Sequence, residues 1–173
     1  MYCRSLLGSE RKGVYTVLVS VRSSALVRVG KLGQFEFFGL YAYTGSGQGR
    51  GSCSMNGRVS RHLGLRREKR VRWHIDYLLA HSQTHVEGAT LSSTNLRSKE
   101  CLVSRNIFSL TKSTPPVIGF GSSDCLCESH LARLKGEPRV AISTILKAHL
   151  RAGLKPELIC NARPPEGIAV RQI

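Results

Sequence analysis

The chain has 173 residues, 41% hydrophobic and 21% charged, which suits one folded domain with a buried core and excludes two full domains. Its 26 lysines and arginines against 11 acidic residues give a net charge of 26 − 11 = +15, which favours a polyanionic partner. The sequence has neither a run of the roughly 18 apolar residues that span a bilayer nor a signal-peptide pattern at its start, so we expect a cytoplasmic protein that does not bind membranes.

The first two predicted elements are strands. Residues 13–21 are rich in β-branched and apolar side chains, and residues 35–44 form a second extended stretch. Between them, Gly30 and Gly33 supply turn conformations. The chain therefore opens with an antiparallel unit that contains additional hairpin turns.

The next segment, residues 45–57, is too rich in Gly and Ser to hold regular structure and leads into a basic helix. Asn56 is the candidate N-cap of that helix. Val59 and Leu63 share its apolar face, and basic side chains project around it.

The remaining segments follow from apolar periodicity and from Gly and Pro positions. They are a helix at 71–81 with a strand as the alternative, a strand at 84–91, a helix from Lys99, a loop at 113–125, a short helix at 128–136 and an amphipathic helix at 138–157. The apolar face of this last helix is predicted to contain Val140, Ile145, Leu146 and Leu150.

Two tyrosines stand in aromatic-glycine strings on the two predicted strands, Tyr15 in GVY and Tyr43 in YTG. Side chains on the same face of neighbouring antiparallel strands lie close together, so the two phenols can converge. A tyrosine in a strand is more often half-buried core with a satisfied hydroxyl, and the strings alone favour that interpretation.

Arg58 and His62 lie four residues apart on the predicted helix and so share one side of it. A guanidinium stabilises charge on a phosphate, and an imidazole moves a proton near neutral pH. The alternative is a solvated basic helix that touches phosphate without specificity. We assign the other basic residues of the region to such backbone contacts: Arg50, Arg61, Arg66, Arg67, Lys69, Arg70 and Arg72.

Phosphodiester hydrolysis also calls for a divalent metal, and a hard ion prefers carboxylate ligands. The candidates in the middle of the chain are Asp76, Glu87, Glu100 and Asp124. Glu100 begins a predicted helix, from which it can reach a site on the sheet. The alternative role for an acidic residue at that position is to complement the helix dipole.

Taken in order, five positions resemble the signature of the GIY-YIG nuclease superfamily: Tyr15, Tyr43 with the Gly-Ser that follows it, Arg58 and His62 in RVSRH, and Glu100 at a helix start. The strings WHIDYLL at 73–79 and GFGSSDCLCESHL at 119–131 resemble one branch of that superfamily. This branch is a largely archaeal group of uncharacterised domains, found alone or fused to an endonuclease-III-like repair glycosylase.

The resemblance implies an α+β fold with a small antiparallel sheet of three core strands, flanked by helices. An expanded hairpin would absorb the 28 positions between Tyr15 and Tyr43 (43 − 15 = 28). Residues 13–134 would be the nuclease-like domain, and 135–173 an extra C-terminal helix and tail. The implied activity is that of a DNA endonuclease with one Mg²⁺ or Mn²⁺, acting in DNA repair or processing, with a repair glycosylase as candidate partner.

The resemblance also implies a role for each signature residue. Tyr15 would help to deprotonate the attacking water, and Tyr43 would orient that water or the phosphate. Arg58 would stabilise the transition state, His62 would assist proton transfer, and Glu100 would hold the metal. Because a phenol titrates at about 10, Tyr15 acts as a base only where the metal and nearby cations lower its pKa.

The six cysteines lack the spacing of a disulfide framework, so we expect free thiols. Three side chains of types that can bind a metal lie within six residues: Cys125, Cys127 and His130. His74 or Asp76 would complete a tetrahedral Zn²⁺ site. Because the spacing differs from that of common zinc fingers, we favour packed cysteines and a hydrogen-bonded imidazole over zinc. A third interpretation places His74, Asp76 and Asp124 along the active cleft.

Three functions therefore stay open: a nuclease, a catalytically inactive nucleic-acid-binding module, and a zinc-stabilised structural domain. Changes at Tyr15, Arg58 and Glu100 separate the first two, because a nuclease loses turnover and keeps its affinity. Removal of zinc would unfold the third.

Overall fold

The computed structural model describes residues 10–64 and 71–160. Five strands and five helices follow in chain order over these ranges. They are β1 (Gly13–Val29), β2 (Gly33–Gly47), the 3-10 helix η1 (Gly51–Cys53), α1 (Met55–His62), α2 (His74–Leu79), β3 (Thr84–Ser93), α3 (Ser98–Thr111), β4 (Leu131–Leu134), α4 (Pro138–Arg151) and β5 (Glu157–Cys160).

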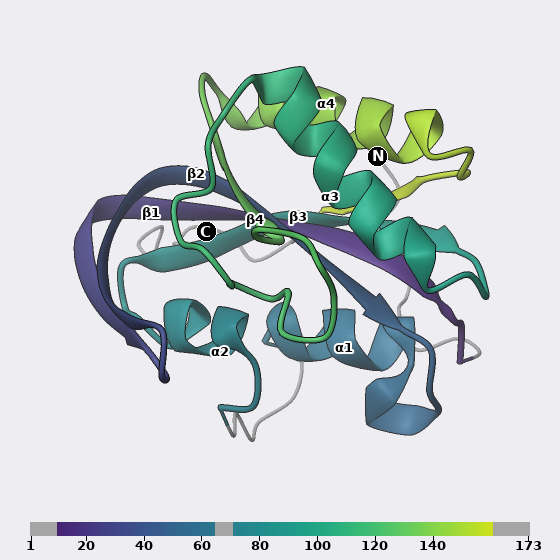
Figure 1. The fold of residues 1–173 in the computed structure, drawn as a ribbon, viewed down its shortest axis with the longest axis horizontal. Helices are drawn as coiled ribbons and strands as arrows, with labels where there is room; N and C mark the ends of the chain where they lie inside the picture. The colour runs from purple at the N-terminus through teal and green to yellow at the C-terminus, as the bar shows by residue number, and fades with distance from the viewer. Residues whose placement is uncertain (1–9, 65–70, 161–173) are drawn as a thin grey trace, which may run out of the picture.

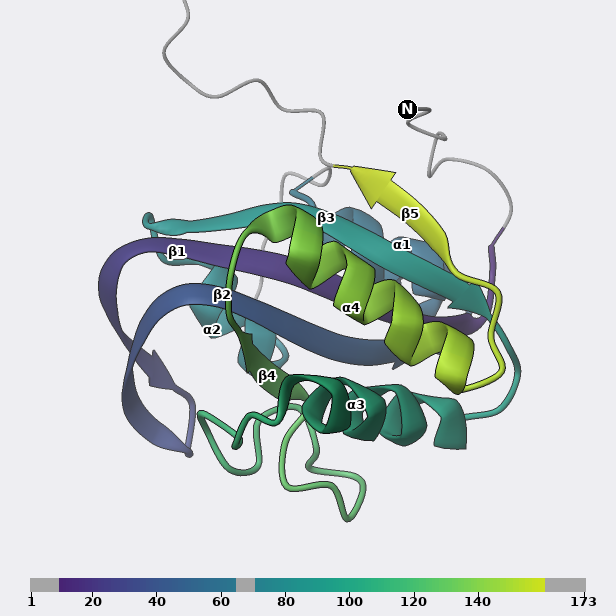
Figure 2. The same cartoon turned by 90° about the horizontal axis from the view of Figure 1, so that it is seen from above.

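The strands form one antiparallel sheet in the order β4-β2-β1-β3-β5. Helices α1 and α2 cover one face of this sheet, and α3 and α4 lie on the other side (Figure 1; Figure 2). The α+β class, the flanking helices and the helix in the C-terminal part are therefore confirmed. No helix within the described residues is long and apolar enough to cross a membrane.

The two leading strands form one continuous hairpin that is longer than the sequence predicted. Pairing runs from Gly13 with Gly47 to Val29 with Gly33, and the register shifts between Val21 and Ala25. A single tight turn closes the hairpin, with positive φ at Gly30 (49°) and Gly33 (117°). The extra turns expected before residue 35 are absent from this stretch, because β1 simply continues past the register shift.

The segment after β2 holds more regular structure than its Gly and Ser content predicted. Strand β2 continues to Gly47, η1 follows, and α1 begins at Met55. The N-cap is Ser54, whose hydroxyl accepts a hydrogen bond from the Gly57 N–H at 3.0 Å. Asn56, the predicted cap, lies inside the helix and is buried, so that prediction is wrong by two residues.

Strand β4 stands where a short helix was predicted, at 128–136. Its backbone pairs with β2, from Leu40 opposite Leu134 to Tyr43 opposite Leu131. The apolar spacing of this short segment suits either structure, and the unpaired edge of β2 decides the outcome by supplying hydrogen-bond partners. Strand β5, which was not predicted, pairs with β3 at the opposite edge of the sheet.

Helix α4 buries only part of the predicted face, including Ile145. Ala141, Ile145 and Ala148 are buried, whereas Val140 and Leu150 are each 58% exposed. Small alanines allow the helix to approach the sheet closely, so the buried face is turned toward them. Together α4 and β5 contribute to the same core and the same sheet as the preceding elements.

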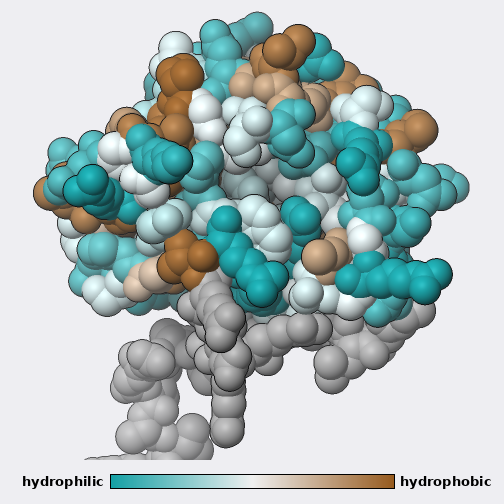
Figure 3. Space-filling view, turned by 60° about the horizontal axis from the view of Figure 1, so that its bottom comes forward, coloured by the Kyte–Doolittle hydropathy of each residue, from teal (hydrophilic) through white to brown (hydrophobic). Residues whose placement is uncertain are grey.

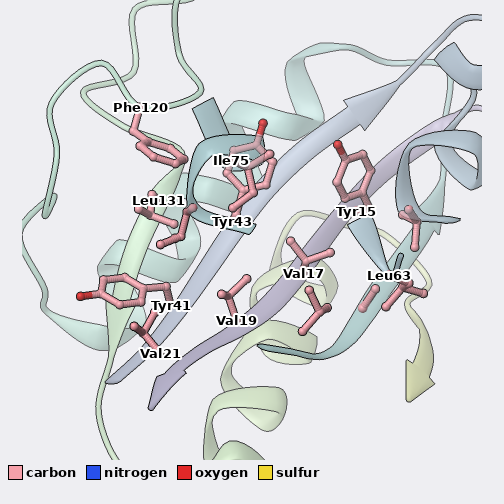
Figure 4. Close-up of a cluster of buried hydrophobic side chains, with 14 of the residues drawn as sticks. Tyr15, Val17, Val19, Val21, Tyr41, Tyr43, Leu63, Ile75, Phe120 and Leu131 are labelled. Carbon is pink, nitrogen blue, oxygen red and sulfur yellow. The ribbon is translucent and has the colours of Figure 1, made fainter. Parts of the chain in front are cut away.

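Two apolar clusters fill the space between the sheet and the helices. On the α1/α2 face the core includes Tyr15, Val17 and Tyr43 from the strands, and Ile75 from α2 (Figure 4). On the α3/α4 face a second cluster includes Leu18, Val103 and Ile145. Because side chains alternate along a strand, β1 contributes to both clusters and is the central strand of the fold.

Candidate functional site

Tyr15 and Tyr43 extend from the same face of the sheet, as the sequence predicted. Tyr15 is paired with Gly45 and Val17 with Tyr43, so the two tyrosines are diagonal neighbours on β1 and β2 (Figure 4). A Cβ atom at position 45 would lie 2.6 Å from the Tyr15 hydroxyl oxygen. Glycine at this position therefore leaves the room through which the Tyr15 phenol crosses β2.

Helix α1 places His62 directly against the first tyrosine. The Tyr15 Oη lies 3.0 Å from His62 Nε2, and both side chains are buried. On the other side of the ring, His62 Nδ1 lies 3.8 Å from Asp76 Oδ1. A proton on Nδ1 faces this carboxylate and leaves Nε2 as the acceptor for the phenol. The three side chains thus form a chain from phenol to imidazole to carboxylate.

Arg58, one turn before His62 on α1, lines a cleft beside the tyrosines. Its guanidinium lies over the Trp73 ring, 4.5 Å from the ring centre. Its Nε is buried and has no hydrogen-bond acceptor within the described residues. A partly buried guanidinium with a buried, unused Nε donor in a cleft is suited to an anionic ligand.

The phenols keep their protons in this environment. Burial raises the pKa of Tyr15 above its ordinary 10.0, and the positive charge of Arg58 partly opposes that change. Burial also raises the pKa of Tyr43, and the neighbouring Tyr15 and Glu100 add to the effect. Both groups therefore serve as hydrogen-bond donors unless a further cation approaches.

Glu100 lies in the first turn of α3 and lines the same cleft as Arg58. Its side chain is 19% exposed, and the Ser46 hydroxyl donates a hydrogen bond to its Oε2. Its Oε1 lies 3.3 Å from His130 Nδ1. Carboxylate and hydroxyl oxygens are ligands that a hard divalent ion takes, so this part of the cleft fits such an ion.

The cleft has a volume of about 730 Å³ and lies where four segments meet: the end of β2 with α1, the start of α2, the start of α3 and the loop before β4. Of the predicted residues, it is lined by Tyr43, Arg58, Arg72, His74, Glu100, Asp124, Cys125 and His130. Ser46, Gln48 and Arg97 also line it and were not predicted. Figure 3 shows the α1/α2 side of the molecule, where hydrophilic residues dominate and apolar residues form separate spots.

Arg61 and Asp76 have partners that the sequence did not reveal. The Arg61 guanidinium makes two hydrogen bonds to the Asp76 carboxylate, at 3.0 and 2.9 Å, and both side chains are 11% exposed. Asp76 also accepts the backbone N–H groups of Arg72 and Trp73 at the start of α2. The structure thus engages Arg61 in an ion pair instead of leaving it for phosphate, and Asp76 lies outside the residues that line the cleft.

The other predicted phosphate contacts differ in position. Arg72 is exposed at the cleft, and Arg50 is exposed beside η1. Arg66, Arg67, Lys69 and Arg70 lie outside the described residues.

A second cluster of functional side chains lies at the far wall of the cleft. The ligand atoms of four residues all lie within 4.8 Å of one another: Cys101, Cys125, Cys127 and His130. This cluster is able to hold a metal ion. Cys101 takes the fourth place that was predicted for His74 or Asp76, because α3 brings it against the loop. His74 Nδ1 instead accepts a hydrogen bond from the Gly121 N–H at 3.0 Å, and burial lowers its pKa.

The thiols of this cluster are strongly affected by their surroundings. Burial and hydrogen bonds with Cys127 and Cys125 raise the pKa of Cys101 to about 12. Burial likewise raises the pKa of Cys127. A bound cation has the opposite effect on a thiol, because it stabilises the thiolate.

The fold and the cleft together define a GIY-YIG-like protein. Its sheet presents two tyrosines on one face, the next long helix adds an arginine and a histidine, and a later helix begins with a glutamate. The chain belongs to the family described as Domain of unknown function DUF123, a GIY-YIG-like family whose profile matches residues 14–151. The match continues past residue 134 to the end of α4. No curated protein and no solved structure matches this chain significantly.

Proposed function

We propose that this protein is a divalent-metal-dependent DNA endonuclease that hydrolyses phosphodiester bonds in DNA repair or processing, in the cytoplasm. The observation that carries the proposal is that Tyr43, Arg58 and Glu100 line one cleft, and that the buried pair of Tyr15 and His62 lies close to Arg58 and Glu100. They come from β1, β2, α1 and α3. Residues so far apart in sequence, with an arginine and a carboxylate lining one cleft, suit phosphoryl chemistry better than general surface binding.

The phosphate would bind in the cleft between Arg58 and Glu100. Arg58 donates from the unused Nε and the rest of its guanidinium, and Trp73 beneath it fixes the plane of the donors. Positive charge held in this way stabilises the negative charge that builds up on the phosphate oxygens in the transition state. Tyr43, which lines the same cleft, would donate a hydrogen bond to a phosphate oxygen or to the attacking water.

Proton transfer would pass through the chain of Tyr15, His62 and Asp76. The Tyr15 oxygen accepts the proton of the attacking water as its own proton moves to His62 Nε2, 3.0 Å away. The Asp76 carboxylate near Nδ1 stabilises the imidazolium that results. This arrangement does not need a free phenolate, which the burial of Tyr15 disfavours.

Glu100 would hold one Mg²⁺ or Mn²⁺, with Ser46 beside it and water and phosphate oxygens completing the coordination. Such an ion neutralises charge on the phosphate and activates water. The thiols of the Cys/His cluster are unsuitable for these hard ions and would take a softer one such as Zn²⁺. A zinc-stabilised domain is therefore compatible with nuclease activity.

The substrate would be held by the net charge of +15 and by exposed arginines at the rim of the cleft, Arg72 and Arg97. The branch that the sequence resembles includes fusions to repair glycosylases, so we propose a glycosylase as partner. Duplexes that have lost a base are then the first substrates to try.

The test is a nicking and cleavage assay on supercoiled plasmid and on intact, branched and abasic duplexes, with Mg²⁺, Mn²⁺ or EDTA. We expect metal-dependent cutting that falls by at least about 100-fold in Glu100→Ala and in Arg58→Ala, with DNA affinity retained in Glu100→Ala. Glu87→Ala is the matched control, because Glu87 lies on β3 and bonds to Ser20, away from the cleft.

Two results would contradict the nuclease. The first is the absence of cutting with every metal and substrate although DNA binds tightly and with strong salt dependence, which is the behaviour of an inactive binding module. The second is cutting that Glu100→Ala and Glu87→Ala reduce equally, because the activity would then come from a different site or a contaminant.

A further inference from the structure

The four ligand atoms of the Cys/His cluster already approach the spacing of a tetrahedral metal centre. With metal–sulfur bonds of about 2.3 Å and metal–nitrogen bonds of about 2.0 Å, neighbouring ligand atoms are roughly 3.5 to 3.8 Å apart. Cys125 Sγ lies 3.5 Å from His130 Nε2, and all four atoms lie within 4.8 Å of one another. A contraction of at most about 1 Å brings them into coordination distance.

The four ligands come from two segments that are each held in place. Cys101 is on α3, and the other three lie in the loop that leads into β4. The base of this loop is closed by backbone hydrogen bonds of 2.7 Å from the Gly119 N–H to Glu128 and from the His130 N–H to Phe120. The His130 carbonyl then accepts the Thr44 N–H of β2 at 3.0 Å.

The tip of the same loop has little apolar packing. Leu126, between two of the cysteines, is fully exposed, and Ser123 and Asp124 are exposed as well. Apolar burial therefore does not explain why three thiols and an imidazole gather beneath this tip. A shared ion explains it, because metal coordination replaces the missing core in small loops.

We propose that Cys101, Cys125, Cys127 and His130 bind one Zn²⁺ in a tetrahedral site, and that Glu100 is the carboxylate partner of the coordinating His130. Three sulfurs and one imidazole nitrogen select zinc over the hard ions that suit the carboxylate side of the cleft. The bond that forms at each cysteine is a Zn–thiolate bond, and the thiol proton is released to water.

The orientation of His130 connects the zinc site to the cleft. Its Nε2 faces Cys125, and its buried Nδ1 faces Glu100 Oε1 at 3.3 Å with no other acceptor in the described part of the chain. Coordination through Nε2 places the proton on Nδ1, where the carboxylate accepts it. The assignment of Glu100 to the catalytic metal rests on the proposed function. On that basis, zinc would hold the Glu100 carboxylate in place in two ways: through its hydrogen bond with His130, and through Cys101, the next residue of α3.

The first test is the metal content of the full chain, purified in reducing buffer without added chelator. We expect one zinc per chain, and tetrahedral thiolate absorption bands when Co²⁺ replaces it. Cys125→Ser and Cys127→Ser should lose zinc and unfold at lower temperature, whereas Cys53→Ser should keep it, because Cys53 is exposed and outside the cluster. Zinc-free protein after refolding with Zn²⁺, a disulfide within the cluster, or equal loss in Cys53→Ser would overturn the site.

The second test measures zinc affinity by competition with a chromophoric chelator. Loss of a carboxylate partner weakens a histidine-containing site by roughly 10- to 100-fold, so Glu100→Gln should show that change and Glu87→Gln should show none. His130→Cys should keep four ligands, and the zinc affinity of that site should no longer change when Glu100→Gln is added. Equal zinc affinity in Glu100→Gln and the unchanged chain would refute the pairing of Glu100 with His130.

Neither measurement depends on DNA cleavage. A chain that binds zinc in this way and never cuts DNA would refute the proposed function and leave the zinc site standing. A chain that cuts DNA with a Glu100-dependent metal and binds no zinc would do the reverse.

Discussion

The proposed chemistry depends on a few buried contacts, of which the hydrogen bond between Tyr15 and His62 is the most informative. Both side chains are almost fully buried, so the contact cannot serve as a general surface interaction with DNA. A tyrosine whose role was packing alone would need its buried ring, but it would not need a hydrogen bond to an imidazole. Removing the hydroxyl alone therefore separates a catalytic role from a packing role.

We predict that Tyr15→Phe lowers the cleavage rate by about 100-fold or more, since proton transfer by a positioned side chain contributes about that much. Stability should change by only about 1 kcal/mol, the usual net contribution of one buried hydrogen bond. Single-turnover cleavage and urea unfolding measure the two effects.

Tyr41→Phe is the matched control. Tyr41 is equally buried on β2, but its hydroxyl bonds to the backbone of Phe38, away from the cleft. A Tyr15→Phe protein that cuts as fast as Tyr41→Phe would show that the first tyrosine is structural.

The ordered signature of the resembled family pointed to the tyrosines, Arg58, His62 and Glu100, and their role in catalysis stays a prediction. Cys101 was missed as a cluster member, although it directly follows Glu100. It lies 24 positions before Cys125 (125 − 101 = 24), and only the docking of α3 against the loop brings the two together. The pairing of Arg61 with Asp76 was missed for the same reason.

At the scale of elements, α4 is attached to the sheet by a buried histidine as well as by apolar packing. His149 Nε2 bonds to the Thr16 hydroxyl of β1 at 3.0 Å, and Nδ1 bonds to the Ser92 hydroxyl of β3 at 2.8 Å. Burial lowers the pKa of His149 from its ordinary 6.5 to about 4. The ring therefore stays neutral in the folded protein, where one hydroxyl donates to it and the other accepts from it.

We predict that the protein loses stability as the pH falls from 6.5 to 4. In this window the unfolded chain binds a proton at His149 and the folded chain does not, so protonation favours unfolding. A difference of about 2.5 pKa units corresponds to roughly 3 kcal/mol at 1.36 kcal/mol per unit. Urea unfolding at several pH values measures it.

His149→Gln keeps a polar side chain between the two strands and removes the titration, so its stability should depend less on pH in this window. His85→Gln, at a partly exposed position of β3, serves as the control. If the slope of stability against pH is the same in all three proteins, His149 does not titrate as described.

Elements with a long apolar pattern were predicted best: the strands at the start, α3 and α4 all exist. The two four-residue strands β4 and β5 were not predicted as strands, because so few residues carry no periodicity that separates helix from strand. β4 and β5 become strands because the outer edges of β2 and β3 supply hydrogen-bond partners. The face of α4 was predicted from large side chains, whereas only Ile145 of these is buried, together with two alanines and a histidine.

For the molecule as a whole, the charge of +15 would govern the proposed binding of DNA. Exposed arginines at the cleft add to a positive surface, and contacts of this kind weaken as salt rises. The affinity alone therefore does not reveal whether DNA enters the cleft. The salt dependence of the affinity measures how many phosphates the protein contacts.

We predict that Arg72→Ala and Arg97→Ala each lower the slope of log affinity against log salt by about 0.9, the value for one lost phosphate contact on duplex DNA. Fluorescence anisotropy in EDTA at several salt concentrations measures the slope without cleavage. Arg139→Ala is the control, since Arg139 is exposed on α4, on the other side of the sheet. Equal slopes for all three variants would mean that DNA does not enter the cleft side.

The order of the strands affects how the protein is made. β1, β2 and β3 come from the first 93 residues, but β4 and β5, which pair with the outer edges of β2 and β3, begin only at residues 131 and 157. During translation, the outer edges of β2 and β3 therefore stay unpaired until β4 and β5 have left the ribosome. Such edges pair readily with other chains. Overproduction should accordingly favour aggregation at this stage, and slower translation or a chaperone that shields nascent strands should increase the yield of folded protein.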